Sequence, residues 1–188
     1  PKSKADLAFT MHMLSWLAVD GTAAIVEFPG VLSRGGTEAR IRQHLVENNY
    51  VDAVIQLPRD LFFGTQIATC IIVLKKSKQD NRTLFVDASK QFVRNGNKSK
   101  LSAENQDMIL ETLAKRSDID HVAALVSADA IRENGFNLSV SSYVEVEDTR
   151  EEVDIVELNA RIKEIVERQA VLRASIDEIV ADLEGGAR

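Results

Sequence analysis

An unbroken heptad repeat near the C-terminus restricts most strongly how this chain can fold. Seam residues recur at alternating spacings of three and four, the pattern of a helix that buries one stripe against partner helices. At about 1.5 Å per residue this helix spans roughly 40–50 Å, which is too long for a small domain to cover. We therefore predict a subunit interface, formed by Ile155, Leu158, Ile162, Ile165, Gln169, Leu172, Ile176, Ile179 and Leu183. The alternative is an amphipathic helix lying along its own domain.

The preceding residues alternate between short apolar runs and amphipathic stretches, which predicts an α/β fold. A strand, a helix and a second strand at these lengths predict a right-handed parallel crossover. The short connection to the next strand predicts an antiparallel neighbour. The expected strands are 22–29, 52–58, 68–76 and 83–89; the expected helices are 6–19, 37–49, 102–116 and 128–133.

Side chains at the expected helix starts support these boundaries. We predict that Asp6, Thr37 and Ser102 each cap a helix. The helix at 6–19 is apolar on nearly every face, so it requires burial on several sides. We predict a polar loop at residues 90–100 and an irregular or extended segment at 135–144. The charged stretch "EVEDTREE" indicates a boundary between a domain at 1–148 and a helical tail at 149–188.

Composition excludes several classes of protein. The chain has 188 residues, a formal net charge of −6 and one cysteine. This charge argues against a generally basic surface for nucleic acid but allows a local basic face. A single cysteine provides no disulfide framework or zinc site, and it fits a reducing, cytoplasmic setting. No apolar stretch approaches the roughly 20 residues of a membrane helix. Because Pro1 stands in place of an initiating methionine, we expect a longer parent protein.

Three segments, "GTAAIV", "GGTEARIRQHL" and "DAVIQLPRDLFFGT", together with the later "IRENGFNLSVSSYV", carry a family likeness. From residue 1 to about Tyr143 the chain resembles the modification subunit of type I restriction–modification systems. Ser33 departs slightly, since family members often have an aromatic residue there. The resemblance implies the C-terminal half of a Rossmann-like, S-adenosylmethionine-dependent domain, a mixed sheet with flanking helices, followed by a long helix.

The resemblance also implies the activity and the partners of the intact subunit. That subunit would methylate adenine N6 in DNA, and a separate specificity subunit would read the sequence. Two modification subunits would join one specificity subunit, and restriction subunits can add to this complex.

Two motifs of such enzymes are absent from the sequence given. It contains no Asn-Pro pair and no Gly-x-Gly. By the resemblance, the S-adenosylmethionine loop and an Asn-Pro-Pro-Phe-type catalytic loop lie upstream of Pro1. We therefore assign no catalytic residue here and expect this chain alone neither to bind the cofactor nor to methylate DNA. One alternative is a non-catalytic interaction module that pairs through its tail. Another Rossmann-type enzyme is a weaker alternative, because no dinucleotide-binding fingerprint is present.

Two adjacent aromatic residues, Phe62 and Phe63, are the candidates for stacking on the target base. In related adenine methyltransferases a phenylalanine just before an apolar strand packs on the flipped adenine, and Phe62 matches that position. We expect Phe62 to face the base and Phe63 to enter the core. The ordinary alternative is that both phenylalanines pack at the end of the sheet.

Five basic residues are candidates for contacts with DNA phosphates, and for those between 90 and 100 a solvated loop is the alternative. They are Arg34, Lys90, Arg94, Lys98 and Lys100. Glycines ahead of a helix in "SRGGTEARIR" could form an anion site, although a loop with surface arginines is the more common arrangement. The histidines have no partners at metal-ligand spacing, and Cys70 in its apolar run is expected in the core.

Overall fold

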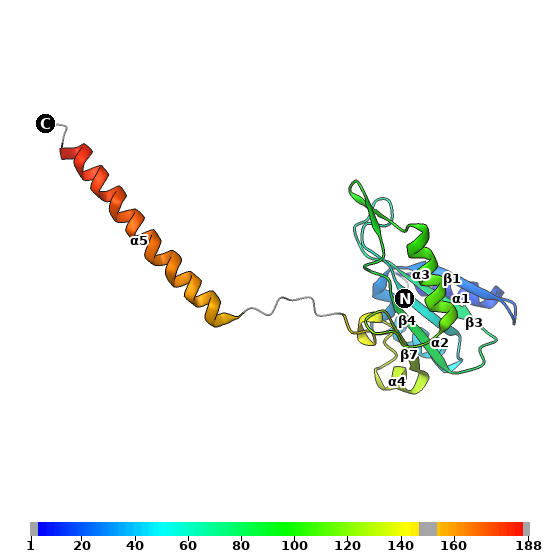
Figure 1. Ribbon diagram of the computed structural model, residues 1–188. Coiled ribbons are helices and arrows are strands. Elements are labelled where there is room, and N and C mark those ends of the chain that lie inside the picture. Colours follow the sequence, from blue (N-terminus) through cyan, green and yellow to red (C-terminus); the bar gives the residue numbers. More distant parts are fainter. Residues whose placement is uncertain (1–3, 147–153, 186–188) are drawn as a thin grey trace. The chain divides into compact units, whose positions relative to one another are not determined.

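The computed structural model describes residues 4–146 and 154–185. The chain divides into two compact units, residues 1–147 and 148–188 (Figure 1). The domain boundary predicted after residue 148 therefore lies outside the described residues.

A mixed sheet of order β1-β3-β2-β4-β7 organises the described part of the first unit. β1 and β2 both run antiparallel to β3, β2 is parallel to β4, and β4 is antiparallel to β7. The strands are β1 (Thr22–Glu27), β2 (Val51–Gln56), β3 (Cys70–Lys75), β4 (Arg82–Asp87) and β7 (Ala123–Ser127). β5 (Val93–Asn95) and β6 (Lys98–Lys100) form a separate hairpin.

Helices flank this sheet. They are α1 (Asp6–Trp16), the 3-10 helix η1 (Pro29–Leu32), α2 (Thr37–Glu47), α3 (Ala103–Lys115), α4 (Ala128–Glu133) and the 3-10 helix η2 (Val140–Ser142). The predicted mixed α/β fold is confirmed. β1 and β2 run parallel, as a crossover requires, although β3 lies between them in the sheet. The predicted antiparallel pairing of β2 with β3 is also confirmed.

Several local predictions are wrong. The polar loop at 90–100 contains the β5–β6 hairpin, and strand β7 was not predicted. Asp6 is the first residue of α1 and Ala5 stands at its cap. Gly36 caps α2 instead of Thr37, and its φ of 70° favours glycine. The cap of α3 is confirmed, because Ser102 accepts a hydrogen bond from the Asn105 amide in a capping box.

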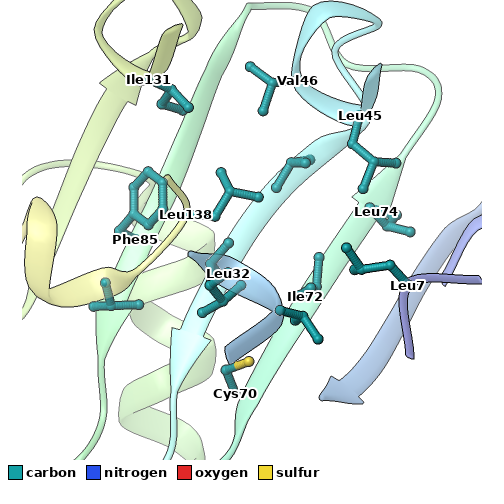
Figure 2. Close-up of a cluster of buried hydrophobic side chains, with 14 of the residues drawn as sticks. Leu7, Leu32, Leu45, Val46, Cys70, Ile72, Leu74, Phe85, Ile131 and Leu138 are labelled. Carbon is teal, nitrogen blue, oxygen red and sulfur yellow. The ribbon is translucent and has the colours of Figure 1, made fainter. Parts of the chain in front are cut away.

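Buried side chains form an apolar core on each face of the sheet. Figure 2 shows the larger cluster, in which Phe85, Ile72 and Leu74 of the sheet meet Leu32 and Leu45 from the covering elements. Each fully buried side chain of this size stabilises the fold by about 1.5–3 kcal/mol. The first unit therefore has a core of its own.

Helix α1 is covered on one side only within this unit. Leu7 and Leu14 are buried, whereas Phe9 is 63% and Trp16 is 81% exposed. The predicted need for burial on several sides is thus only partly met by the described residues.

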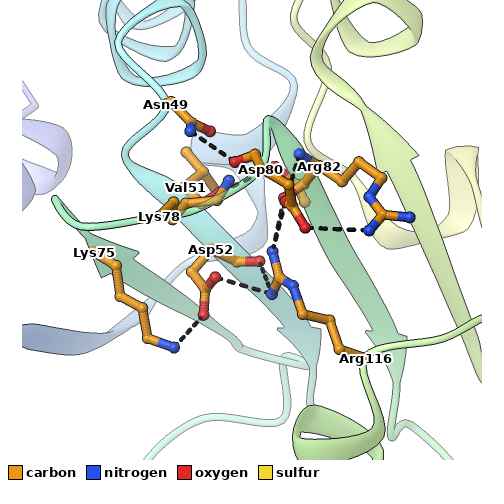
Figure 3. Close-up of polar contacts among 9 residues, drawn as sticks. Asn49, Val51, Asp52, Lys75, Lys78, Asp80, Arg82 and Arg116 are labelled. Atoms are coloured by element: carbon orange, nitrogen blue, oxygen red, sulfur yellow. Dashed lines mark hydrogen bonds and ion pairs between the residues drawn. The ribbon is translucent and has the colours of Figure 1, made fainter.

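Ion pairs link the amino end of β2 to β3 and to the end of α3 (Figure 3). The Asp52 carboxylate lies 2.9 Å from Lys75 Nζ and 2.9 Å from Arg116 Nη1. Arg116 Nη2 also donates to the Arg82 carbonyl at 2.8 Å. Lys78 Nζ donates to the Val51 carbonyl at 2.6 Å, and burial lowers the pKa of Lys78 to about 8. These contacts join the β3–β4 turn and the end of α3 to the sheet.

The second unit contains helix α5 (Ile155–Gly185). The predicted long helix is confirmed. Its apolar seam residues are exposed, from 46% for Leu158 to 72% for Leu183. No described helix is both long and apolar enough to cross a membrane.

Candidate functional site

The carboxyl ends of three parallel strands meet at one edge of the sheet. Glu27 of β1 pairs with Cys70 of β3, Cys70 pairs with Gln56 of β2, and Gln56 pairs with Asp87 of β4. These residues therefore form one row across the sheet. In open α/β sheets, ligands bind outside the carboxyl ends of the strands. We take this edge, with the loops that leave it, as the candidate site.

The loop between β2 and β3 carries both predicted aromatic residues beyond this row. The Phe62 side chain is 38% exposed, and Phe63 is 100% exposed. The expectation that Phe63 enters the core is wrong within this chain. The loop turns through left-handed residues, Asp60 with φ 60° and Gly64 with φ 79°. Such angles suit aspartate and glycine, and they carry the aromatic pair outward.

The β5–β6 hairpin holds this aromatic loop from the side. Arg94 Nη1 lies 3.4 Å from the Asp60 carboxylate, and the Ser99 amide donates to the Asp60 carbonyl at 3.0 Å. Lys98 Nζ donates to the carbonyls of Phe62 at 3.2 Å and Thr65 at 3.5 Å. The sequence analysis missed this arrangement. Its signal was the Asn95-Gly96 pair, which is typical of hairpin turns.

Arg34 lies elsewhere on the same edge and already has partners. Its guanidinium carbon is 5.1 Å from the centre of the Phe28 ring, and Nη1 lies 3.5 Å from the Glu38 carboxylate. A side chain at Gly30 would collide with this guanidinium. Because Glu38 is buried in the first turn of α2, the local charge there does not favour an anion.

The remaining basic candidates are exposed, with Lys90 ahead of the hairpin in the chain and Lys100 at the end of β6. The four basic residues between 90 and 100 thus lie in or just before the β5–β6 hairpin. Arg34 lies apart from them, in the connection between η1 and α2. Contact of any of them with DNA phosphates stays a prediction.

Glu27 is a buried acid at this edge that the sequence analysis missed. Its carboxylate accepts a hydrogen bond from Thr10 Oγ1 at 2.8 Å. Burial raises the pKa of Glu27 above its ordinary value, and the Thr10 hydrogen bond only partly opposes this effect. Neighbouring Cys70 is a buried core residue, as expected, and burial raises its pKa to about 12. A thiol of this kind is not a nucleophile at neutral pH.

No group of histidine, cysteine, aspartate or glutamate within the described ranges could hold a metal ion. The site loops described here present an aromatic surface, and the sequence given contains no Gly-x-Gly turn of the kind that holds a nucleotide-like cofactor. This edge can therefore stack on a flat ligand and position it.

Comparison with known proteins identifies the kind of domain to which this edge belongs. The family model described as N-6 DNA Methylase matches residues 1–152. The chain belongs to the N-6 DNA methylase family. It is 46% identical, over 97% of its length, to the type I restriction enzyme MpnII methylase subunit of Mycoplasma pneumoniae. The predicted likeness to type I modification subunits is thereby confirmed.

Two solved structures show the same fold. A type I restriction–modification methyltransferase subunit from Streptococcus thermophilus is 42% identical, with a TM-score of 0.76 over 77% of this chain. A structure described as concerning assembly of the type I R-M system shares the fold over 94% of this chain, with a TM-score of 0.61 and 16% identity.

The present chain spans about a third of the length of these relatives. It covers 34% of the Mycoplasma subunit and 31% of the Streptococcus chain. The matched portion of the family domain is the sheet and site edge described above.

Proposed function

We propose that the protein containing this chain methylates adenine N6 in DNA, with S-adenosylmethionine as methyl donor, as the modification subunit of a type I restriction–modification system. Family membership supports the methyltransferase chemistry. The observation that supports a flipped adenine as the substrate is an exposed aromatic pair, Phe62 and Phe63, beyond the carboxyl edge of the sheet.

In this proposal the target adenine leaves the duplex and stacks on Phe62. An enzyme that modifies a base extrudes it from the helix and holds it between apolar or aromatic side chains. A stacking surface must have a fixed position, and Phe62 is partly packed whereas Phe63 is wholly exposed. Stacking of one base on an aromatic side chain contributes about 1–3 kcal/mol. Phe62 is therefore the better platform, and Phe63 is free to contact the DNA beside it.

Positioning is the chief contribution of this chain to catalysis. The adenine amine is a poor nucleophile because its lone pair is delocalised into the ring. Holding it in line with the methyl group lowers the barrier by replacing a bimolecular encounter with a fixed geometry. We assign the cofactor loop and the Asn-Pro-Pro-Phe-type loop, whose oxygens would accept the hydrogens of the amine, to another part of the parent protein.

The open edge of the sheet suits the attachment of that other part. β1 is the terminal strand of the described sheet, and its Val26 side chain is 48% exposed. The neighbouring helix α1 exposes Phe9 and Trp16. In the intact domain, further chain would pair with β1 and cover these apolar side chains.

Helix α5 is proposed to bind helices of a specificity subunit. Its seam repeats without a break over nine positions, from Ile155 to Leu183, and the seam is exposed in this unit. Val166 and Val180 widen the apolar stripe, which suits a bundle with more than one neighbour. DNA, a second modification subunit and a restriction subunit complete the proposed assembly.

The parent protein, purified with its specificity subunit, provides the test. The experiment measures transfer of a labelled methyl group to DNA that carries the unmodified target site, followed by mass spectrometry of the nucleosides. We expect N6-methyladenine, and a large loss of it in Phe62→Ala. Methyl transfer to cytosine only, or none by the complete complex, would contradict the proposal.

This chain alone provides the complementary measurement. Titration calorimetry with S-adenosylmethionine should show no binding, because the glycine-containing loop is not part of it. Tight binding would show that the cofactor pocket was placed wrongly. A non-catalytic interaction module, favoured by the exposed seam of α5, is the second candidate; it predicts complex formation by a parent protein that never methylates DNA.

A further inference from the structure

We propose that the β5–β6 hairpin positions the aromatic loop, and that Lys98 is the residue through which it does so. This inference rests on the proposed function, because the loop matters for catalysis only if it receives the target base. Lys98 and Arg94 were expected to contact DNA phosphates. In the structure both are directed to the loop that carries Phe62.

The aromatic loop makes few regular contacts of its own. Within the described structure it leaves β2 after Gln56 and re-enters the sheet at Cys70, and residues 57–69 lie in no strand or helix. A local contact from Arg59 Nε to the Gln66 carbonyl measures 3.3 Å. Asp60 and Gly64 can adopt the positive φ angles that the loop requires, but no strand or helix fixes the position of residues 57–69. Contacts from other elements therefore help to hold the loop in place.

The hairpin supplies such contacts on both sides of the aromatic pair. Before Phe62, the Ser99 amide donates to the Asp60 carbonyl at 3.0 Å, and Arg94 Nη1 lies 3.4 Å from the Asp60 carboxylate. After it, Lys98 Nζ donates to the carbonyls of Phe62 and Thr65. The Lys98 ammonium group thus links the backbone of Phe62 to the backbone of Thr65.

Lys98 and Lys100, two residues apart on β6, differ in their surroundings. Lys98 is partly buried and directed inward to the loop carbonyls, whereas Lys100 is exposed. A lysine whose ammonium binds these two carbonyls restrains the loop backbone at Phe62, and the Phe62 ring projects from that backbone. Lys98 is therefore a positioning residue that acts on the base through Phe62.

The test uses the intact modification subunit in its complex with the specificity subunit. For the fluorescence measurement the DNA carries 2-aminopurine at the target adenine, whose fluorescence rises when the base leaves the stack. Because 2-aminopurine lacks the 6-amine, kcat is measured on the same DNA with adenine at that position. Lys98→Met removes the ammonium and keeps an apolar stem. Lys100→Met removes a charge on the same strand, and Lys115→Met removes one on α3, where Lys115 is 65% exposed.

We expect Lys98→Met to reduce the fluorescence change at saturating DNA and to lower kcat about tenfold. Its DNA affinity and the salt dependence of binding should stay close to those of the parent complex. Lys98→Arg should restore most of the signal, because a guanidinium also donates to two carbonyls. Lys100→Met and Lys115→Met should leave the fluorescence change at saturating DNA intact.

A contact with phosphate predicts a different result and would overturn the inference. Lys98→Met would then weaken DNA binding and reduce the slope of log affinity against log salt by about 1, with normal fluorescence at saturation. An unchanged fluorescence signal and kcat would overturn it as well. Failure of the unsubstituted complex to transfer any methyl group would instead reject the proposed function.

Arg94→Met provides a second variant should Lys98→Met fail to fold. It removes the ion pair to Asp60 on the other side of the platform. Because this pair is partly exposed, we expect the same direction of change and a smaller one. A normal fluorescence change and kcat in Arg94→Met would contradict the role of the hairpin.

Discussion

The two units of this chain use apolar side chains in opposite ways. In the first unit they are buried on both faces of a sheet, and Phe85, Leu74 and Ile72 are almost fully inaccessible. In the second they form a continuous stripe along α5 that stays exposed, with Ile165 at 65% and Leu172 at 58%. A core gives a region its own stability, whereas an exposed seam gives it a requirement for a partner.

In the proposed function the first unit takes part in the reaction and the second unit in subunit assembly. The first unit can place a loop at the edge of its sheet because the strands beneath are fixed by burial. Helix α5 has no buried side chain among its described residues, so in the proposed assembly its stability would come from the partner that covers its seam. Substitutions in the two units should therefore produce different kinds of loss, which the following experiments compare.

Charges placed in the seam should produce the largest effect. Ile165→Asp with Leu172→Asp removes two apolar side chains from the proposed interface and adds two carboxylates. Loss of about 3–6 kcal/mol of burial predicts at least about a 100-fold fall in affinity for the specificity subunit. Co-purification and calorimetry would measure it.

The control places the same two aspartates on the opposite face of α5, as Ala160→Asp with Ala174→Asp. We expect this variant to retain binding, and both variants to keep the thermal unfolding of the first unit. Undiminished complex formation by the seam variant would break the comparison between the units.

Truncation in the core should produce the next largest effect, confined to the first unit. Phe85 is fully buried and stacks on Tyr143 with ring centres 4.3 Å apart. Phe85→Ala should lower the free energy of unfolding by about 3–5 kcal/mol, measured by urea denaturation. Phe63→Ala, the same substitution at a fully exposed site, should change it by less than about 0.5 kcal/mol. Equal losses would refute the assignment of Phe63 to the surface.

The ion pairs of Asp52 should contribute less than the core does. Asp52→Asn leaves Lys75 and Arg116 without their carboxylate at the amino end of β2. We expect a loss of about 1–3 kcal/mol, measured by the same denaturation. Asp129→Asn, which disrupts an exposed pair with Arg132, should cost less than about 1 kcal/mol. A larger loss at Asp129 than at Asp52 would mean that burial does not determine the strength of these pairs.

Neutralising Glu27 should produce the smallest effect, and it should be a gain. Because burial raises the pKa of Glu27 in the folded state, the fold loses stability as pH rises from the ordinary pKa of glutamate through the folded one. Glu27→Gln should therefore raise the melting temperature at pH 7 and have little effect below about pH 4. The oxygen of glutamine can still accept the Thr10 hydroxyl. The reverse sign at pH 7 would contradict the stated cause.

Sequence patterns predicted those elements whose signal is local. The apolar runs of β1 to β4 and the cap at Ser102 depend on residues a few positions apart, and the structure confirms them. The short run of β7 has no clear alternation, so its strand depends on pairing with β4. The hairpin is largely polar, and only its Asn95-Gly96 turn carries a signal.

Burial at individual positions was harder to predict, because it depends on residues distant in sequence. Phe62 and Phe63 are adjacent and chemically identical, and only the path of the loop decides how far each is covered. Arg42 is buried in α2 because its guanidinium donates to the carbonyls of Val31 and Phe136. The residues within one helical turn of Arg42 do not predict a hydrogen-bond partner 94 residues away.

Hydrogen exchange gives the most direct measurement of the contrast between the units. Amides of β2 and β4 in this chain alone should exchange slowly, and those of α5 at least about 100-fold faster. Addition of the specificity subunit should slow exchange along the seam of α5 and leave the sheet unchanged. Equal protection of α5 and the sheet in the isolated chain, or no response of α5 to the specificity subunit, would contradict the account.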